Sequence, residues 1–301
     1  MGIETTRVLL FGASGFLGGH IRATLAADAT LVCPTRADCD LLDVSVDALT
    51  GLIRATAPSA VVNCTGQVGG DGDLMVRAHI VVTAKLIEAV ARGAPEARLI
   101  RLGSAGEYGP VTVGSRVPET RPGDPVGAYG LSHLAATRLV ELAVAAGRLD
   151  ALVLRVFNPI GPGMPRQNVL GRATRLLRTA LRCGSSEIVL GPLDACRDFV
   201  DVRDVAMAVR AALRAPLLRR PVVNVGSGTA VPIRRVVRML AAVAGYDGVV
   251  TEAAPSPDAT RSAGVPWMCA DISAARELGW TPSYDLADTL KAIWVADPDV
   301  S

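Results

Sequence analysis

Lysine is almost absent from this chain of 301 residues: Lys85 and Lys291 are the two that it has, although Lys and Arg together number 31. Asp and Glu number 29, so the formal net charge is only +2. A protein dedicated to nucleic acid usually carries a basic excess or a basic stripe. This balance therefore argues against a nucleic-acid partner.

Long apolar runs are missing as well. Half of the residues are hydrophobic (50%), but Arg, Gly, Pro or Asp interrupts every stretch before the roughly 18 apolar residues that a spanning helix needs. The first residues do not join a basic segment to an apolar one, which is the pattern of a secretory signal. Aromatic residues make up 4%, so the core is mainly Ala, Val and Leu. We expect a cytoplasmic protein without a membrane partner.

The six cysteines form no CxxC pair and do not cluster with the three histidines. Disulfide scaffolds are small and rich in cysteine, and zinc sites need closely spaced pairs of ligands. We therefore expect no metal site, and we interpret the thiols as small buried hydrophobic groups in a reducing compartment. A GxSxG motif is also missing, which argues against a serine hydrolase.

Short apolar runs alternate with helical patterns through the first half of the chain. The predicted strands cover residues 8–11, 31–33, 60–62, 99–102 and 152–157, and the predicted helices cover 18–27, 46–57, 73–92 and 129–146. Near-continuous apolar strands separated by helices indicate a parallel sheet covered on both faces. The sequence therefore predicts an α/β protein with a doubly wound parallel sheet of the Rossmann type.

The pattern changes after residue 157. Turns rich in Pro and Gly at 158–163 precede a basic helix at 168–182 and short strands at 188–190 and 222–225. Such turns interrupt regular structure and mark a change of organisation. We therefore divide the chain into a Rossmann domain, residues 1–157, and a mainly substrate-binding lobe, residues 158–301, with later segments completing the sheet.

Three glycines follow the first strand, at positions 12, 15 and 18, directly before the first helix. A tight turn, a close approach of the backbone to a pyrophosphate and close helix–strand packing each exclude a Cβ atom, and the helix N-terminus offers N–H donors. We therefore predict a dinucleotide site at this turn. Its residues are Gly12, Ser14, Gly15, Phe16, Leu17 and Gly18.

The end of the second strand distinguishes the two nicotinamide dinucleotides. NAD sites have a carboxylate there that accepts a hydrogen bond from the ribose, and NADP sites have a cation. Arg36 occupies this place, so the sequence favours NADP(H), with NAD(H) as the alternative. A solvated surface arginine is the other interpretation of Arg36.

The GxxGxxG spacing resembles that of short-chain dehydrogenases/reductases, and further segments extend the likeness along nearly the whole chain. They are residues 103–109, 155–163, 196–205, 224–228 and 277–282. These segments resemble extended members of the NAD-dependent epimerase/dehydratase family, above all its GDP-6-deoxy-4-keto-D-mannose reductases, with a cofactor segment similar to that of GDP-fucose synthases. The resemblance implies a nucleotide-sugar as the small-molecule substrate. It also implies a homodimer, since family members commonly dimerise through the helices that carry the tyrosine motif.

The resemblance further implies a catalytic set. In this family a tyrosine protonates the carbonyl oxygen, a serine orients the carbonyl, and a lysine four residues after the tyrosine holds the nicotinamide ribose and lowers the tyrosine pKa. The matching positions hold Ser104, Tyr129 and His133, and His79 stands where the family has a helix asparagine. His133 could serve an active reductase, belong to a protein with weakened or lost redox chemistry, or support different acid–base chemistry.

The residues that meet cofactor and substrate are also implied by the resemblance. The cofactor set comprises Leu42 and Asp43 at the adenine, Cys64, Thr65 and Gly66 in a loop of small residues, and Tyr129 and His133. The substrate set comprises Ser104, Asn158, Arg197 and Arg261. Arginine suits a diphosphate because its planar fork can donate two parallel hydrogen bonds.

The residues after Ser104 bear on the type of reaction. Dehydratases of the family have an acid directly after the catalytic serine or threonine, whereas this chain has Ala105 and Gly106. We therefore predict an NADPH-dependent ketoreductase of a nucleotide-linked 4-keto-6-deoxy sugar or a similar polar carbonyl compound. The alternatives are an NAD(P)-dependent nucleotide-sugar epimerase and a redox-impaired NADP-binding regulatory or scaffold protein.

Overall fold

The computed structural model describes residues 6–67, 69–254 and 264–296. Arg261, which the sequence assigns to the substrate, lies outside these residues. None of the helices in the described ranges is long and apolar enough to cross a membrane.

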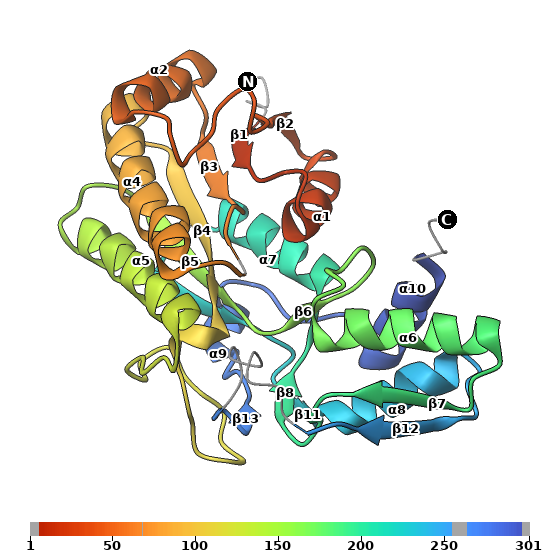
Figure 1. Ribbon diagram of the computed structural model, residues 1–301. Helices are drawn as coiled ribbons and strands as arrows, with labels where there is room; N and C mark the ends of the chain where they lie inside the picture. Colours follow the sequence, from red (N-terminus) through yellow and green to blue (C-terminus); the bar gives the residue numbers. More distant parts are fainter. Residues whose placement is uncertain (1–5, 68, 255–263, 297–301) are drawn as a thin grey trace.

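A six-stranded, all-parallel sheet forms the centre of the larger part of the molecule (Figure 1). Its order is β10-β5-β4-β3-β1-β2. The strands are β1 (Thr6–Phe11), β2 (Ala29–Val32), β3 (Ala60–Asn63), β4 (Arg98–Ser104), β5 (Ala151–Val156) and β10 (Val222–Val225). Their buried apolar runs explain why both faces are covered, and the predicted fold class is confirmed.

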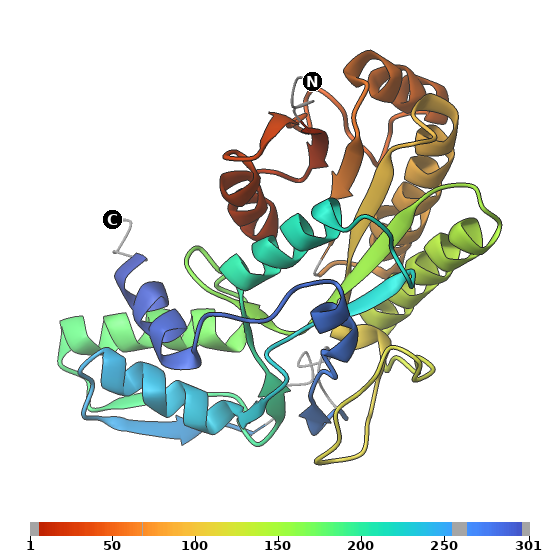
Figure 2. The ribbon, with the colours of Figure 1, turned by 180° about the vertical axis from the view of Figure 1, so that it is seen from behind.

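Helices cover the two faces of this sheet, as Figures 1 and 2 show. One face carries α1 (Phe16–Leu25) and α7 (Val202–Arg214), which pack against each other. The other carries α2 (Val46–Thr56), α4 (Val82–Gly93) and α5 (Ala128–Ala145). The short helix α9 (Ser273–Glu277) contacts β10. Each face therefore has its own aliphatic core.

The helix predicted at 73–92 is present but changes its winding. It begins as α3 (Gly72–Met75), continues through a π-helical segment, η1 (Val76–Val81), and then becomes α4. Asp71 caps the start by accepting a hydrogen bond from the backbone N–H of Leu74 at 2.9 Å. π-turns often mark functional sites, and this one contains the buried His79.

The smaller lobe lies beyond the carboxyl ends of the strands. It packs α6 (Val169–Cys183), α8 (Ile233–Val243) and α10 (Leu286–Ala296) around a third core. Its strand pairs are β7 (Glu187–Leu190) with β12 (Val249–Glu252), β6 (Pro159–Ile160) with β9 (Val200–Asp201), and β8 (Cys196–Asp198) with β11 (Ala230–Pro232) and β13 (Trp267–Met268). β10 and α7 follow residue 157 in the sequence, but β10 belongs to the six-stranded sheet and α7 packs on α1 at one face of it.

The six cysteines are all free, but they are not uniformly buried. Cys269 is buried, whereas Cys33, Cys39, Cys64 and Cys196 are partly exposed. Cys183 is exposed because it is the last residue of α6 and lies past the lobe core. The interpretation of all six as buried hydrophobic groups is therefore wrong.

Candidate active site

The glycine turn between β1 and α1 leaves no room for side chains at two of its three glycines. Gly12 adopts φ +78°, and a Cβ atom there would lie 2.9 Å from the backbone of Cys64. A Cβ atom on Gly18 would lie 2.0 Å from the carbonyl oxygen of Gly12. Gly15 is less restricted, with 3.3 Å to the same oxygen. The turn thus has the tight backbone that a dinucleotide loop requires.

The N-terminus of α1 is open for an anion. Gly15 is its N-cap, no side chain of the described residues caps it, and its first turn has no acidic residue. Ser14 and Gly15 are exposed, while Phe16 and Leu17 begin the helix. Uncapped N–H groups and the positive end of the helix dipole favour a pyrophosphate at this place.

The loop after β3 lies directly against this turn. The backbone of Cys64 and Thr65 is the nearest group to Gly12, and Thr65 donates from its backbone N–H and its hydroxyl to Oδ1 of Asn63, at 3.0 and 2.6 Å. Gly66 follows as an exposed residue. The structure therefore brings the predicted small-residue loop and the predicted phosphate loop together.

The residues predicted at the adenosine end are solvent-accessible. The Arg36 side chain is 79% exposed and makes a long ion pair of 3.8 Å with Asp40. Asp43 is paired with Arg77 at 3.0 Å. The backbone carbonyl of Leu42 accepts a hydrogen bond from Nζ of Lys85 at 2.9 Å. Arg36 is thus free to turn toward a ligand, whereas Asp43 already has a cationic partner.

Ser104 and Tyr129 line one cavity of about 240 Å³ at the carboxyl end of β4. Leu17 of the glycine turn, Asn158 and Arg197 line the same cavity. Its remaining walls include four apolar side chains, which are Val126, Val156, Val265 and Met268. Five of the predicted site residues therefore meet at the edge where parallel α/β sheets bind ligands.

Ser104 is held by a capping box at the end of β4. Its hydroxyl oxygen accepts from the backbone N–H of Gly106 at 3.1 Å, and its own backbone N–H donates to Glu107 at 3.0 Å. Glu107 is fully buried and pairs with Arg155, which is 2% exposed, at 2.7 Å. Since the hydroxyl oxygen accepts from the backbone, its hydrogen can point into the cavity.

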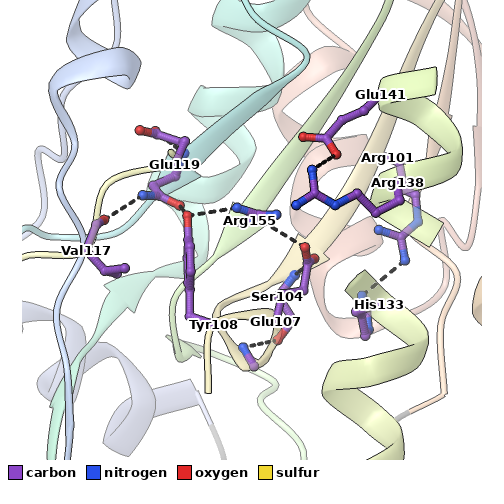
Figure 3. A network of polar contacts seen from close by, with 12 residues as sticks. Arg101, Ser104, Glu107, Tyr108, Val117, Glu119, His133, Arg138, Glu141 and Arg155 are labelled. Carbon is purple, nitrogen blue, oxygen red and sulfur yellow. Dashed lines mark hydrogen bonds and ion pairs between the residues drawn. The ribbon is translucent and has the colours of Figure 1, made fainter. Parts of the chain in front are cut away.

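A buried polar network continues behind Ser104 (Figure 3). Arg155 donates to the hydroxyl of Tyr108 at 3.0 Å, and that hydroxyl donates to Asn224 at 2.7 Å. Burial raises the pKa of Tyr108 to about 12. The sequence reasoning missed this network, although the charged Arg155 within an apolar strand was a signal for it.

His133 lies behind Tyr129 and does not line the cavity. It is 6% exposed, its ring centroid is 4.7 Å from that of Tyr129 and 4.0 Å from that of His79, and its Nδ1 lies 3.1 Å from Nη2 of Arg101 (Figure 3). Burial and the nearby Arg101 lower the pKa of His79 to about 4, and burial, Arg101 and His79 hold the pKa of His133 well below its usual range. Both histidines are therefore neutral at pH 7.

Asn158 and Arg197 meet the cavity from the lobe side. Asn158, at φ +31°, donates from Nδ2 to the carbonyl of Asp198 at 2.9 Å. Arg197 is 5% exposed and donates from Nη1 to the carbonyl of Cys196, while its buried Nη2 has no partner among the described residues. Burial lowers the pKa of Arg197. A buried donor without a partner at a cavity wall suits an anionic ligand.

A Rossmann sheet, a glycine turn at its first helix and a serine–tyrosine pair in a cavity facing a second lobe define a nucleotide-dependent enzyme of the extended short-chain dehydrogenase type. The chain belongs to the NAD dependent epimerase/dehydratase family, whose model matches residues 8–226. The predicted family and the predicted class of cofactor, a nicotinamide dinucleotide, are thereby confirmed.

Curated proteins similar to this chain include two sugar-nucleotide enzymes. One is the dTDP-6-deoxy-L-talose 4-dehydrogenase (NAD(P)(+)) of Kitasatospora kifunensis, which is 38% identical over 96% of this chain and 95% of its own length. Another is the GDP-6-deoxy-D-mannose reductase of Pseudomonas aeruginosa, 29% identical over 96% of each. A similar solved structure is that of RMD from Pseudomonas aeruginosa complexed with NADPH, with a TM-score of 0.84, 27% identity and coverage of 97% of this chain and 99% of that one.

Proposed function

We propose that this protein is an NADP(H)-dependent oxidoreductase that interconverts the C4 ketone and the C4 alcohol of a nucleotide-linked 6-deoxy sugar. The observation that carries the proposal is the cavity that Ser104 and Tyr129 line together with Leu17 of the glycine turn and Arg197, whose Nη2 has no partner in the described part of the chain. That arrangement puts a proton donor, a carbonyl-binding hydroxyl, the cofactor loop and an anion site within reach of one substrate.

The chemical roles follow from the functional groups of Tyr129 and Ser104 and from the hydrogen bond that Ser104 accepts. In the direction of reduction, the Tyr129 hydroxyl gives its proton to the C4 oxygen, and in oxidation it takes that proton back. The Ser104 hydroxyl, whose oxygen accepts from Gly106, donates to the C4 oxygen and orients it. The cofactor, when bound, supplies or accepts the hydride.

The cavity walls support a 6-deoxy sugar. Val126, Val265 and Met268 are apolar and suit a C6 methyl group better than a hydroxymethyl or carboxylate group. Arg197 is the one charged side chain among the described lining residues, and its guanidinium suits the diphosphate. The names of two relatives, a 6-deoxy-talose dehydrogenase and a 6-deoxy-mannose reductase, agree with this choice.

The glycine turn fits a dinucleotide, and Arg36 favours the form with a 2′-phosphate. Among the described residues, its exposed guanidinium has only a long ion pair of 3.8 Å with Asp40, which a bound phosphate can replace. We expect Arg36→Ala to weaken NADPH binding by about tenfold and NADH binding by less than twofold, because one charge-assisted hydrogen bond contributes roughly 1.5 kcal/mol. Fluorescence titrations with both cofactors measure this, with Arg54→Ala on α2 as the surface control. Equal losses for the two cofactors would contradict the assignment.

The proposed reaction is tested with dTDP- and GDP-linked 4-keto-6-deoxyhexoses and NADPH, and in reverse with the 6-deoxy sugars and NADP⁺. Stoichiometric NADPH oxidation with a C4 alcohol as product supports the proposal. A change of C4 configuration without net oxidation of cofactor would make the protein an epimerase. Tight NADPH binding without turnover on any sugar would make it a non-catalytic NADP-binding protein.

A further inference from the structure

We propose that Arg101 is a positioning residue that takes over the two tasks of the family's lysine: it fixes the group that holds the nicotinamide ribose, and it supplies the positive charge behind Tyr129. This inference rests on the proposed function for its role in catalysis. The arrangement that carries it is the contact between Arg101 on β4 and His133 on α5 (Figure 3).

Arg101 is a cation in the middle of β4, between the buried Ile100 and Leu102. It is 3% exposed, and its side chain is directed at the helices that carry the two buried histidines. Nε donates to the hydroxyl of Thr83 at 3.1 Å, and Nη2 points at Nδ1 of His133, also at 3.1 Å. Its Nη1 is buried and has no partner among the described residues.

This contact determines the tautomer of His133. A guanidinium can only donate hydrogen bonds, so Nδ1 of His133 must accept, and the single hydrogen of the neutral ring must sit on Nε2. His79 is fixed in the opposite sense. Its Nε2 accepts from the backbone N–H of Gln67 at 3.0 Å, so Nδ1 carries the hydrogen and donates to the hydroxyl of Ser132 at 2.8 Å.

The Nε2–H group of His133 is then a permanent donor one helical turn after Tyr129. A lysine at this position would offer N–H donors to the ribose hydroxyls, and the fixed imidazole offers one. Without Arg101, both tautomers of the ring become accessible, and the donor would be lost for part of the molecules. A lysine ammonium always carries N–H donors, whereas the N–H of His133 stays on Nε2 because of the contact with Arg101.

The positive charge comes from Arg101 as well. The charged and titratable groups that face this site are His79 from η1, Arg101 from β4, Glu107 after β4, Arg155 from β5 and His133. The two histidines are neutral, and Arg155 is paired with the fully buried Glu107. Among the described residues behind Tyr129, Arg101 is therefore the cation that has no carboxylate partner.

Stability alone does not account for this residue. A buried cation is costly unless it is paired, and an apolar side chain of similar volume is often more stabilising than even a paired one. Arg101 has a hydroxyl and a neutral imidazole as partners, and its Nη1 has no partner within the described ranges. Such an arrangement is expected where a charge is retained for its effect on a neighbour.

The first test determines the tautomer and the protonation of His133 by NMR and needs no substrate. In protein labelled with ¹⁵N-histidine, we expect His133 to show the pure Nε2–H tautomer and no titration between about pH 6 and pH 9. The Arg101→Met variant should show averaged or exchanged ¹⁵N shifts for His133, with an unchanged His20 signal as the internal control. An Nδ1–H tautomer or an imidazolium in the wild-type protein at pH 7 would overturn the proposal.

The second test measures how the charge of Arg101 affects the pH dependence of kcat/KM for alcohol oxidation. In this direction Tyr129 must be deprotonated to accept the proton of the alcohol. Arg101→Gln keeps a donor for His133 but removes the cation, so the rising limb of kcat/KM should move up by about one pH unit, a tenfold loss at fixed pH. Arg101→Lys keeps the cation and should therefore show the same pH profile as the wild type, unlike Arg101→Gln. Arg138→Gln, which removes a surface cation from α5, should leave the profile unchanged.

The outcomes separate the two proposals. A uniform loss of rate in Arg101→Gln without a shift of the profile, accompanied by a lower melting temperature, would mean that Arg101 is merely structural and would overturn the charge role. If the wild-type protein turns over no sugar nucleotide, the proposed function fails. The NMR experiment would still decide whether Arg101 sets the state of His133.

Discussion

The resemblance to the family implies a lysine at the position of His133, and the surroundings of His133 explain why a lysine would not fit there. The site is 6% exposed and faces the guanidinium of Arg101 at 3.1 Å. A neutral imidazole can accept from that guanidinium, whereas an ammonium group would repel it. The substitution at position 133 and the arginine at position 101 therefore belong together.

We expect His133→Lys to destabilise the protein by about 3 kcal/mol, because it adds an uncompensated buried charge beside an existing one. The measurement is urea unfolding of the variant and the wild type, together with kcat/KM. The double variant Arg101→Met/His133→Lys has one cation instead of two and is expected to regain most of the loss. A stable single variant with a large gain in rate would contradict this account and would mean that the natural protein is catalytically impaired.

His79 is expected to make stability depend on pH. Its pKa is lowered to about 4 in the folded protein, mainly by burial and then by Arg101, and is near 6.5 in the unfolded chain. The unfolded state thus takes up the proton first as the pH falls. The stability that neutral His79 contributes is therefore complete above about pH 6.5 and is lost progressively toward pH 4.

The variant His79→Asn removes this titration, and His133 should stay neutral in both proteins because burial and Arg101 still lower its pKa. The free energy of unfolding of the wild type should fall relative to the variant between about pH 7 and pH 5, with a slope of up to about 1.4 kcal/mol per pH unit. Urea unfolding at several pH values measures the difference. A difference that stays constant over this range would show that His79 does not titrate abnormally.

At the scale of elements, the turn before α1 has a matched pair of neighbouring glycines. A Cβ atom on Gly18 would lie 2.0 Å from the Gly12 carbonyl oxygen, whereas one on Gly19 would lie 3.9 Å from that of Ala13. We expect Gly18→Ala to weaken NADPH binding at least tenfold and to lower the melting temperature by several degrees. Gly19→Ala should bind normally and be slightly more stable, since alanine favours a helix. Similar behaviour of the two variants would contradict the geometry of the turn.

The strands and helices of the first half could be predicted because their periodicity is local information. Mainly apolar runs of three to six residues identified β1, β3, β4 and β5, and the glycine spacing identified the turn before α1. The π-helical segment η1 could not be predicted, because apolar periodicity does not distinguish it from an α-helix and because its buried His79 contacts the backbone of Gln67, 12 residues earlier. Arg101 was visible in its strand, but its partner His133 is 32 residues away in sequence.

At the scale of the whole molecule, the cavity needs segments that are far apart in the chain. Ser104 ends β4, Tyr129 lies in the first turn of α5, and Asn158 follows β5. Arg197 and Met268 come from β8 and β13 of the smaller lobe. The rule that ligands bind at the carboxyl ends of parallel strands predicted that Ser104 would lie at the ligand site. The lobe's contribution could be carried over only by resemblance, because no local pattern says which lobe residue faces the sheet.

The homodimer stays a prediction, and the surface of α5 supports it. Leu131 and Leu142 on this helix are 58% and 67% exposed, and at a spacing of eleven residues, about three helical turns, they lie on one side of α5, where a partner could cover both. α5 also carries Tyr129 and His133, so an interface there would stiffen the helix that holds the proposed catalytic tyrosine.

The most direct test of the central claim follows a labelled hydride. NADPH deuterated at nicotinamide C4 is incubated with dTDP- and GDP-linked 4-keto-6-deoxyhexoses, and the product is analysed by mass spectrometry and NMR. We expect deuterium at C4 of the sugar with the wild-type protein and with Tyr284→Phe, a control at an exposed tyrosine. Tyr129→Phe should bind NADPH normally but transfer the label at least 100-fold more slowly. Label transfer at the wild-type rate by Tyr129→Phe, or NADPH binding with no label on any of these sugars, would contradict the account.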